Sequence, residues 1–122
     1  MKKVAGVSEI VSLTIANNAA LSDAFEMSIF LGGSVYVPAT WTAANIGFKI
    51  SDSLSGTFDI ALDKTGVPIQ ISNVNTGRAG WYSIPIELFA NKFVKLWSKN
   101  TTAATETDIN QGGARAMKIA LK

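Results

Sequence analysis

The stretch from Tyr36 to Gly66, YVPATWTAANIGFKISDSLSGTFDIALDKTG, decides the fold. Pro38 ends a first strand, because proline has no N–H to donate to a neighbouring strand, and Trp41 then fills a corner. After the corner and again after a turn-rich loop, apolar residues alternate with polar ones, as in strands with one buried face. The stretch therefore predicts a β-hairpin whose core-facing side chains are Phe48, Ile50, Phe58, Ile60 and Leu62.

The same alternation predicts strands on both sides of the hairpin, at residues 11–15, 25–31, 34–37, 67–72, 81–84 and 114–122. Residues 86–97 fit two periods: we favour a short turn over 87–91 and a strand over 93–98, and a helix across 86–97 is the alternative. About eight short strands with glycine-bearing turns predict an all-β, single-domain antiparallel β-sandwich of jelly-roll type over residues 1–122, with an N-terminal arm at 1–6. Its expected core also includes Val94, Leu96, Ile119 and Leu121.

Composition narrows the function classes. Hydrophobic residues make up 48% of the 122 residues and charged residues 16%, which favours a folded core. The net charge of +2, spread over single cations, is too small to indicate nucleic-acid binding. No apolar run has the roughly 18 residues of a membrane helix. We also expect an unprocessed chain, because the residues after Lys3 are too polar for a signal peptide.

No catalytic constellation is recognisable. The sequence has no cysteine and no histidine, so thiol chemistry and the usual neutral-pH base are excluded. We therefore expect no enzyme, no cofactor and no metal. One alternative is calcium binding by the carboxylates of Asp52, Asp59 and Asp63. A weaker one is metal binding by Glu106 and Asp108.

Binding surfaces are the remaining possibility. The N-terminal arm, with Met1, Lys2, Lys3 and Val4, and the polar loop 100–113, with Glu106 and Asp108, are segments expected to contact a partner. Alternatively, Trp41, Trp81 and Trp97, with Tyr36 and Tyr82, form a platform on which a sugar stacks if two of them face solvent; Trp41 and Trp81 are the expected pair.

Three stretches also carry a resemblance: VPATWTAANIGFKISDSLSGTFDIALDKTG, GWYSIPIELFANKFVKLWSKN and INQGGARAMKIALK. They contain a PxxW corner and a QGxAR lead into the last strand. From Tyr36 on, the chain resembles small β-sandwich proteins that coat or decorate tailed bacteriophage particles. KFVKLWS is also similar to a central strand of galactose-binding-like jelly rolls, which hold a sugar in loops at one end.

The first resemblance implies a phage virion structural protein, a capsid decoration or stabilising subunit. Its expected partner is the major capsid protein or another virion protein, and we expect a homo-oligomer located in the virion after synthesis in the host cytoplasm. Neither nucleic acid nor membrane is an expected partner. The second resemblance implies a carbohydrate-binding module for adhesion or receptor binding, on a virion fibre or a cell surface.

Overall fold

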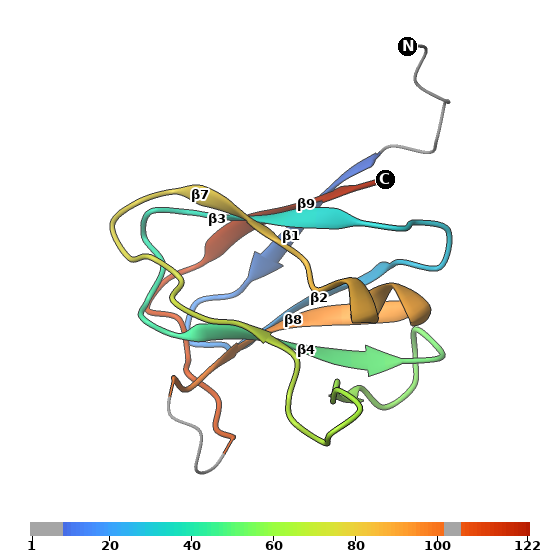
Figure 1. Ribbon diagram of the computed structural model, residues 1–122. Coiled ribbons are helices and arrows are strands. Elements are labelled where there is room, and N and C mark those ends of the chain that lie inside the picture. The colour runs from blue at the N-terminus through green and yellow to red at the C-terminus, as the bar shows by residue number, and fades with distance from the viewer. Residues whose placement is uncertain (1–8, 102–105) are drawn as a thin grey trace.

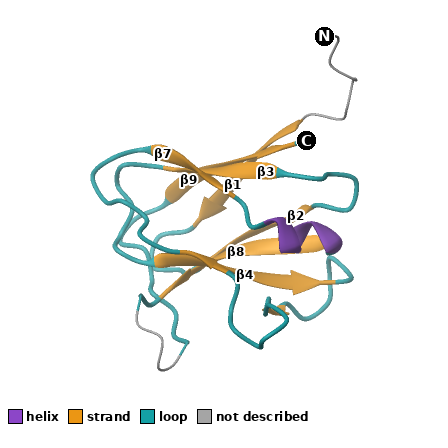
Figure 2. Cartoon of the chain, viewed as in Figure 1, coloured by secondary structure: helices purple, strands orange, loops and turns teal. Residues whose placement is uncertain are grey.

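The computed structural model describes residues 9–101 and 106–122 of the chain, and everything below concerns these residues. They form one short 3₁₀-helix and nine strands, all paired antiparallel (Figure 2). The all-β prediction is thereby confirmed. The elements are β1 (Glu9–Ile15), β2 (Leu21–Glu26), β3 (Gly33–Val37), β4 (Asn45–Ser51), β5 (Asp59–Ile60), β6 (Gln70–Ile71), β7 (Gly80–Ser83), η1 (Ile86–Ala90), β8 (Phe93–Lys99) and β9 (Arg115–Leu121).

The strands form two layers (Figure 1). Sheet A has the order β1-β9-β3-β7, and sheet B has the order β2-β8-β4, with β5 and β6 both on the outer edge of β4. One pairing, between Ile15 and Ser22, joins β1 to β2 and so joins the two sheets. From β1 to β4 each strand lies in the layer opposite its predecessor, and β7, β8 and β9 alternate in the same way. This two-layered antiparallel arrangement confirms the expected β-sandwich.

The core lies between the two layers. β9 supplies Met117, Ile119 and Leu121 from sheet A, and β8 supplies Val94 and Leu96 from sheet B. Of the predicted core positions, Phe48, Val94, Leu96, Ile119 and Leu121 are buried. Ile50 is half-buried and packs against the core. The turn at η1 and the strand that follows it, β8, match the favoured interpretation of residues 86–97, and the helix alternative is wrong.

The hairpin's second strand was predicted in the wrong register. The regular strand is only Asp59–Ile60; the next residue, Ala61, is buried, and Leu62 is 53% exposed. The N–H of Ala61 donates to the Phe48 carbonyl and its own carbonyl accepts from Ile69, so the backbone turns Ala61 inward. Phe58 and Ile60 are therefore only half-buried, and the Lys95 ammonium lies 4.6 Å from the Phe58 ring centre.

The predicted strand over 25–31 was also misplaced. The strand begins earlier, at Leu21, and ends at Glu26. Phe25 and Met27 are buried as the alternation predicts, but the Phe30 N–H then donates to the Met27 carbonyl and closes a turn. Ile29 and Leu31 consequently face solvent, while Phe30 is buried.

No helix in the described part of the chain is long and apolar enough to cross a membrane.

Gly47 in β4 provides space for two side chains on the outward side of sheet B. A Cβ at this position would lie 2.8 Å from Cε3 of Trp97 and 2.7 Å from Cδ of Lys99. Both neighbours are almost fully buried, so neither has open space into which to move. Glycine is required here by packing rather than by backbone conformation.

We predict that Gly47→Ala lowers the free energy of unfolding by about 1–3 kcal/mol, the usual cost of overpacking a dense site. The matched control is Gly32→Ala, where a new Cβ has nothing within 4 Å. This control is expected to change stability by less than about 0.5 kcal/mol. Urea unfolding of both variants makes the comparison, and equal stabilities would contradict this packing account.

Candidate functional site

The outward side of sheet A brings together exposed side chains from four strands. Successive residues of a strand point to opposite faces, and the strand register aligns the outward ones in rows. One row contains Ile10, Ala120, Ser34 and Ser83, and the next contains Ser12, Lys118, Tyr36 and Trp81. With Thr14 and Ala116, which pair in β1 and β9, these ten residues are called the sheet A face.

The sheet A face is almost uncharged. Lys118 is the single charged side chain among its ten positions, and most of the others are serine, threonine or alanine. Ile10 and Trp81 are large apolar side chains, and both are more than half exposed. Removing apolar surface from water is favourable, and covering small side chains leaves few polar atoms unpaired. The face is thus suited to burial against another surface.

An aromatic pair lies at the β7 side of this face. The rings of Tyr36 and Trp81, neighbours across β3 and β7, have centres 5.4 Å apart and are tilted by 57°. The Lys118 ammonium lies 5.5 Å from the Tyr36 ring centre, within range of a cation–π attraction. Trp81 is 51% exposed, so its indole is available to a ligand or a partner.

The structure contradicts the sugar platform as predicted, because Trp41 is only 2% exposed. Its backbone N–H donates to the Pro38 carbonyl, and its indole N–H donates to the Ala44 carbonyl at 3.1 Å. The corner therefore turns the ring into the core, where its large apolar area is most stabilising. Tyr36, not Trp41, lies beside Trp81.

Glu106 and Asp108, predicted to contact a partner, are bound to β8 of their own chain. Glu106 forms an ion pair of 2.7 Å with Lys99, which is 1% exposed and also donates to Oε1 of Gln70 at 2.6 Å. Asp108 accepts a hydrogen bond of 2.7 Å from the indole of Trp97. These carboxylates anchor the end of the polar loop and cover Trp97. The other predicted contacts, Met1, Lys2, Lys3 and Val4, lie outside the described residues.

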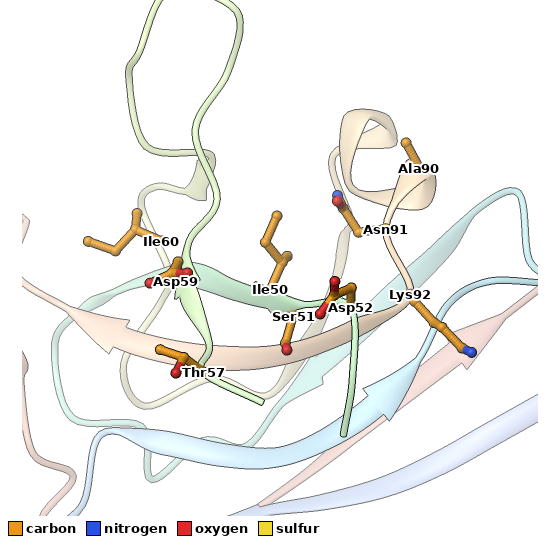
Figure 3. A pocket seen from close by; sticks show the side chains of 9 residues that line it. All are labelled: Ile50, Ser51, Asp52, Thr57, Asp59, Ile60, Ala90, Asn91 and Lys92. Atoms are coloured by element: carbon orange, nitrogen blue, oxygen red, sulfur yellow. The ribbon is translucent and has the colours of Figure 1, made fainter. Parts of the chain in front are cut away.

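The three aspartates of the calcium alternative do not converge. Asp52 and Asp59 line a cavity of about 560 Å³, and Figure 3 shows Ile50 between them. Asp63 does not line this cavity. Its carboxylate accepts from the hydroxyl of Thr65 and from the backbone N–H groups of Val67 and Thr65, which lower the pKa of Asp63. Among the described residues, no group of three acidic side chains is placed to hold a metal ion.

The two motifs of the resemblance meet in space. Gln111, from the QGxAR lead, is 1% exposed; its amide accepts from the N–H of Thr42 and donates to the Thr42 carbonyl and to the hydroxyl of Ser98. Arg115 donates to Oε1 of Gln111 and to the hydroxyl of Thr42. Thr42 directly follows Trp41 of the PxxW corner. The motifs therefore form a structural tie between the corner and the start of β9.

Sequence reasoning missed most of the sheet A face. The available signal was the scarcity of charge at the outward positions of two strands. These positions are Ile10, Ser12 and Thr14 in β1, and Ala116, Lys118 and Ala120 in β9. Exposed strand positions commonly carry charged residues, whereas five of these six are uncharged. Their adjacency depends on pairing between the first and last strands, which the sequence pattern does not specify.

No protein-family model matches the chain, and no curated protein matches it. Among solved structures, the chain is similar to the SPBc2 prophage-derived protein YomS, with a TM-score of 0.44 and 16% sequence identity over 98% of each chain. A likeness at this level carries no argument about function, so the proposals below rest on the geometry of the chain and on its sequence.

We predict that Glu106→Gln lowers the free energy of unfolding by about 3 kcal/mol, because it leaves the buried Lys99 ammonium without its counter-charge. The double variant Lys99→Met/Glu106→Leu removes both charges and is expected to recover most of this loss. Glu87→Gln, at an exposed position of η1, is the control and should be silent. Thermal unfolding of the four proteins tests this, and an equal effect of both glutamine variants would contradict it.

We also predict that acrylamide quenches the fluorescence of one tryptophan only. Trp41 and Trp97 are each 2% exposed, whereas Trp81 is 51% exposed. Trp81→Phe should therefore abolish nearly all quenching while the remaining emission stays blue-shifted. Strong residual quenching in this variant would show that a second indole reaches solvent and would contradict the placement of Trp41.

Proposed function

We propose that the chain is a non-enzymatic structural protein of a phage virion, a decoration or stabilising subunit attached to the lattice of the major capsid protein. The observation that carries the proposal is the sheet A face, a four-stranded outward surface with one charge among ten positions. The resemblance of the stretches from Tyr36 onward to small virion proteins supports the identity of the partner.

The sheet A face suits protein attachment for a physical reason. Burying a charged side chain without a partner costs several kcal/mol, whereas burying serine, alanine or threonine costs little when their few polar groups find partners. Ile10 and Trp81 add apolar area, and aromatic residues are enriched in the centres of protein interfaces. We therefore assign the attachment surface to sheet A.

Sheet B lacks these properties on its outward side. Lys49 and Lys95 lie opposite each other across β4 and β8, and Trp97 beside them is covered by its own chain through Asp108. A partner at sheet B would have to desolvate or neutralise the two lysines. This contrast supports one attachment face per subunit, with sheet B directed away from the lattice.

No chemical step is part of the proposal. The sequence contains neither histidine nor cysteine, so an enzymatic role would have to rest on carboxylates, hydroxyls or lysines. Asp52 and Asp59 line one cavity, with Ile50 between them (Figure 3), and Glu9 and Glu26 line another. Attachment alone accounts for the site described here, and copies repeated over a lattice gain strength through avidity.

We predict that Ser12→Glu, at the β1 end of a row of the sheet A face, weakens attachment to purified particles at least about tenfold, because the new carboxylate must be desolvated. Ser55→Glu, in the exposed turn after β4, is the matched control and should bind as the unmodified protein does. Both variants should melt within about 2 °C of the unmodified protein, since both positions are exposed. Co-sedimentation with particles of the phage that encodes the chain provides the measurement.

The proposal also predicts how many copies of the chain purified particles contain. Mass spectrometry of purified particles should find the chain at a copy number near that of the lattice sites. If it is absent from particles, or if the two glutamate variants bind equally well, the sheet A face is not an attachment surface for the capsid.

A second candidate function rests on the Tyr36–Trp81 pair, in which Tyr36 is half-buried and Trp81 is exposed, so that a sugar ring binds by stacking on Trp81. This candidate is a carbohydrate-binding module. It predicts that Trp81→Ala abolishes retention on a glycan column, whereas Ser12→Glu, at the other end of the same row, leaves retention unchanged. Under the attachment proposal no glycan is retained, and Ser12→Glu has its effect on particle binding.

A further inference from the structure

Strand β7 forms an edge of the fold. It pairs with β3 along one side, and no described strand pairs with its other side. In Figure 1, β7 lies at the border of the upper layer, followed by the segment that descends to η1. An edge strand presents unpaired N–H and C=O groups and is a template for pairing with another strand.

The hydrogen bonds of β3 show which backbone groups of β7 face this open edge. The Ile84 N–H donates to the Gly33 carbonyl at 3.0 Å. Because hydrogen-bonded and non-hydrogen-bonded pairs alternate along an antiparallel ladder, Tyr82 is directed toward β3, and the backbone groups of Trp81 and Ser83 are directed outward.

The far side of β3 gives the same assignment independently. There, Gly32 and Lys122 exchange hydrogen bonds at 3.0 and 2.9 Å, so Ser34 and Tyr36 are directed toward β9. Gly33 and Val35 are then directed toward β7, in agreement with the bond from Ile84. Two N–H groups and two C=O groups, those of Trp81 and Ser83, therefore point away from the sheet at its edge.

We propose that these groups pair with β7 of a second copy of the chain, antiparallel and about a two-fold axis through Tyr82. In this register Trp81 lies opposite Ser83 of the partner subunit, and Ser83 lies opposite Trp81 of the partner subunit. Each Ser83 N–H donates to a Trp81 carbonyl, and each Trp81 N–H donates to a Ser83 carbonyl. All four outward N–H and C=O groups of each strand then have a hydrogen-bond partner. Both copies use the same surface, as a two-fold interface requires.

The composition of β7 favours a second copy as the occupant. Its sequence, Gly80–Trp81–Tyr82–Ser83, has no charge that would face its own image across the axis. The other edge of sheet A is β1, which pairs with β2 at Ile15 alone. There, self-pairing would bring two copies of Glu9 into one sheet, and the Thr14 N–H already donates to Asp23. β7 is therefore the edge suited to pairing between identical chains.

The side chains of β7 also agree with this pairing. Diagonal neighbours across two strands lie about 7–8 Å apart, within reach of aromatic side chains. The two copies of Trp81, each 51% exposed in the single chain, would meet in this way on the outward face.

The biological role of this pairing depends on the proposed function, because the dimer would strengthen attachment to the capsid. Sheet A of one copy would continue into sheet A of the next, so two sheet A faces would form one surface of eight strands. Because four paired residues bury less than the roughly 1,200 Å² of a standard interface, the dimer is expected to be weak in solution. On a lattice, two linked faces bind far more tightly than one.

The test compares Ser83→Pro with Ser83→Ala by sedimentation equilibrium of the full chain up to about 1 mM. Proline removes the outward N–H of Ser83, which pairs with no group of residues 9–101 and 106–122, and proline is tolerated on edge strands. Alanine keeps this N–H. We expect a concentration-dependent dimer for the unmodified protein and for Ser83→Ala, and at least about tenfold weaker association for Ser83→Pro, since two hydrogen bonds are lost.

Acrylamide quenching gives a second readout that also checks the fold. Quenching of Trp81 should fall as the concentration of the unmodified protein rises, and should stay constant in Ser83→Pro. A protein that remains monomeric to about 1 mM, or a dimer that Ser83→Pro does not weaken, overturns the pairing. A dimer that does not bind particles would instead contradict the proposed function, so the two failures are distinguishable.

Discussion

The pairing of β9 between β1 and β3 is the constraint on which the rest of the structure depends. Seven residues of β9 pair with β1 and four pair with β3. A slip of one residue would turn Ile119 to solvent and Lys118 into the core, because side chains alternate with a period of two. The start of β9 is held by Gln111 and Arg115, which bind Thr42 at the corner. This polar tie and the apolar alternation specify the same register.

The two layers differ in what covers their outward sides. On sheet B, Trp97 is packed over Gly47 and bound by Asp108, and the Lys99 charge is neutralised by Glu106. The chain thus uses Glu106 and Asp108 to cover part of this layer. Sheet A receives no comparable cover from the described residues, and apart from Lys118 its outward positions are small, aromatic or apolar. This asymmetry is the structural basis for assigning attachment to sheet A.

Local pattern predicted most elements, because alternation is a property of a few adjacent residues. It placed β4, β8 and β9 correctly, and it resolved residues 86–97 into a turn and a strand. It failed where a turn overrides alternation, as at Phe30, and where a backbone irregularity turns Ala61 inward. The local pattern could not predict most of the candidate site, because the sheet A face is assembled from strands distant in sequence. Trp41 and Trp81 looked equivalent in the sequence and are opposite in exposure.

The most direct test of the attachment face is the acylation of lysines in the free protein and on assembled particles, read by mass spectrometry. Lys118 lies within the sheet A face, and Lys64 lies in an exposed turn outside it. If sheet A is the attachment surface, Lys118 should become strongly protected on the particle while the reactivity of Lys64 stays the same. Equal reactivity of Lys118 in the free and bound protein would contradict this assignment.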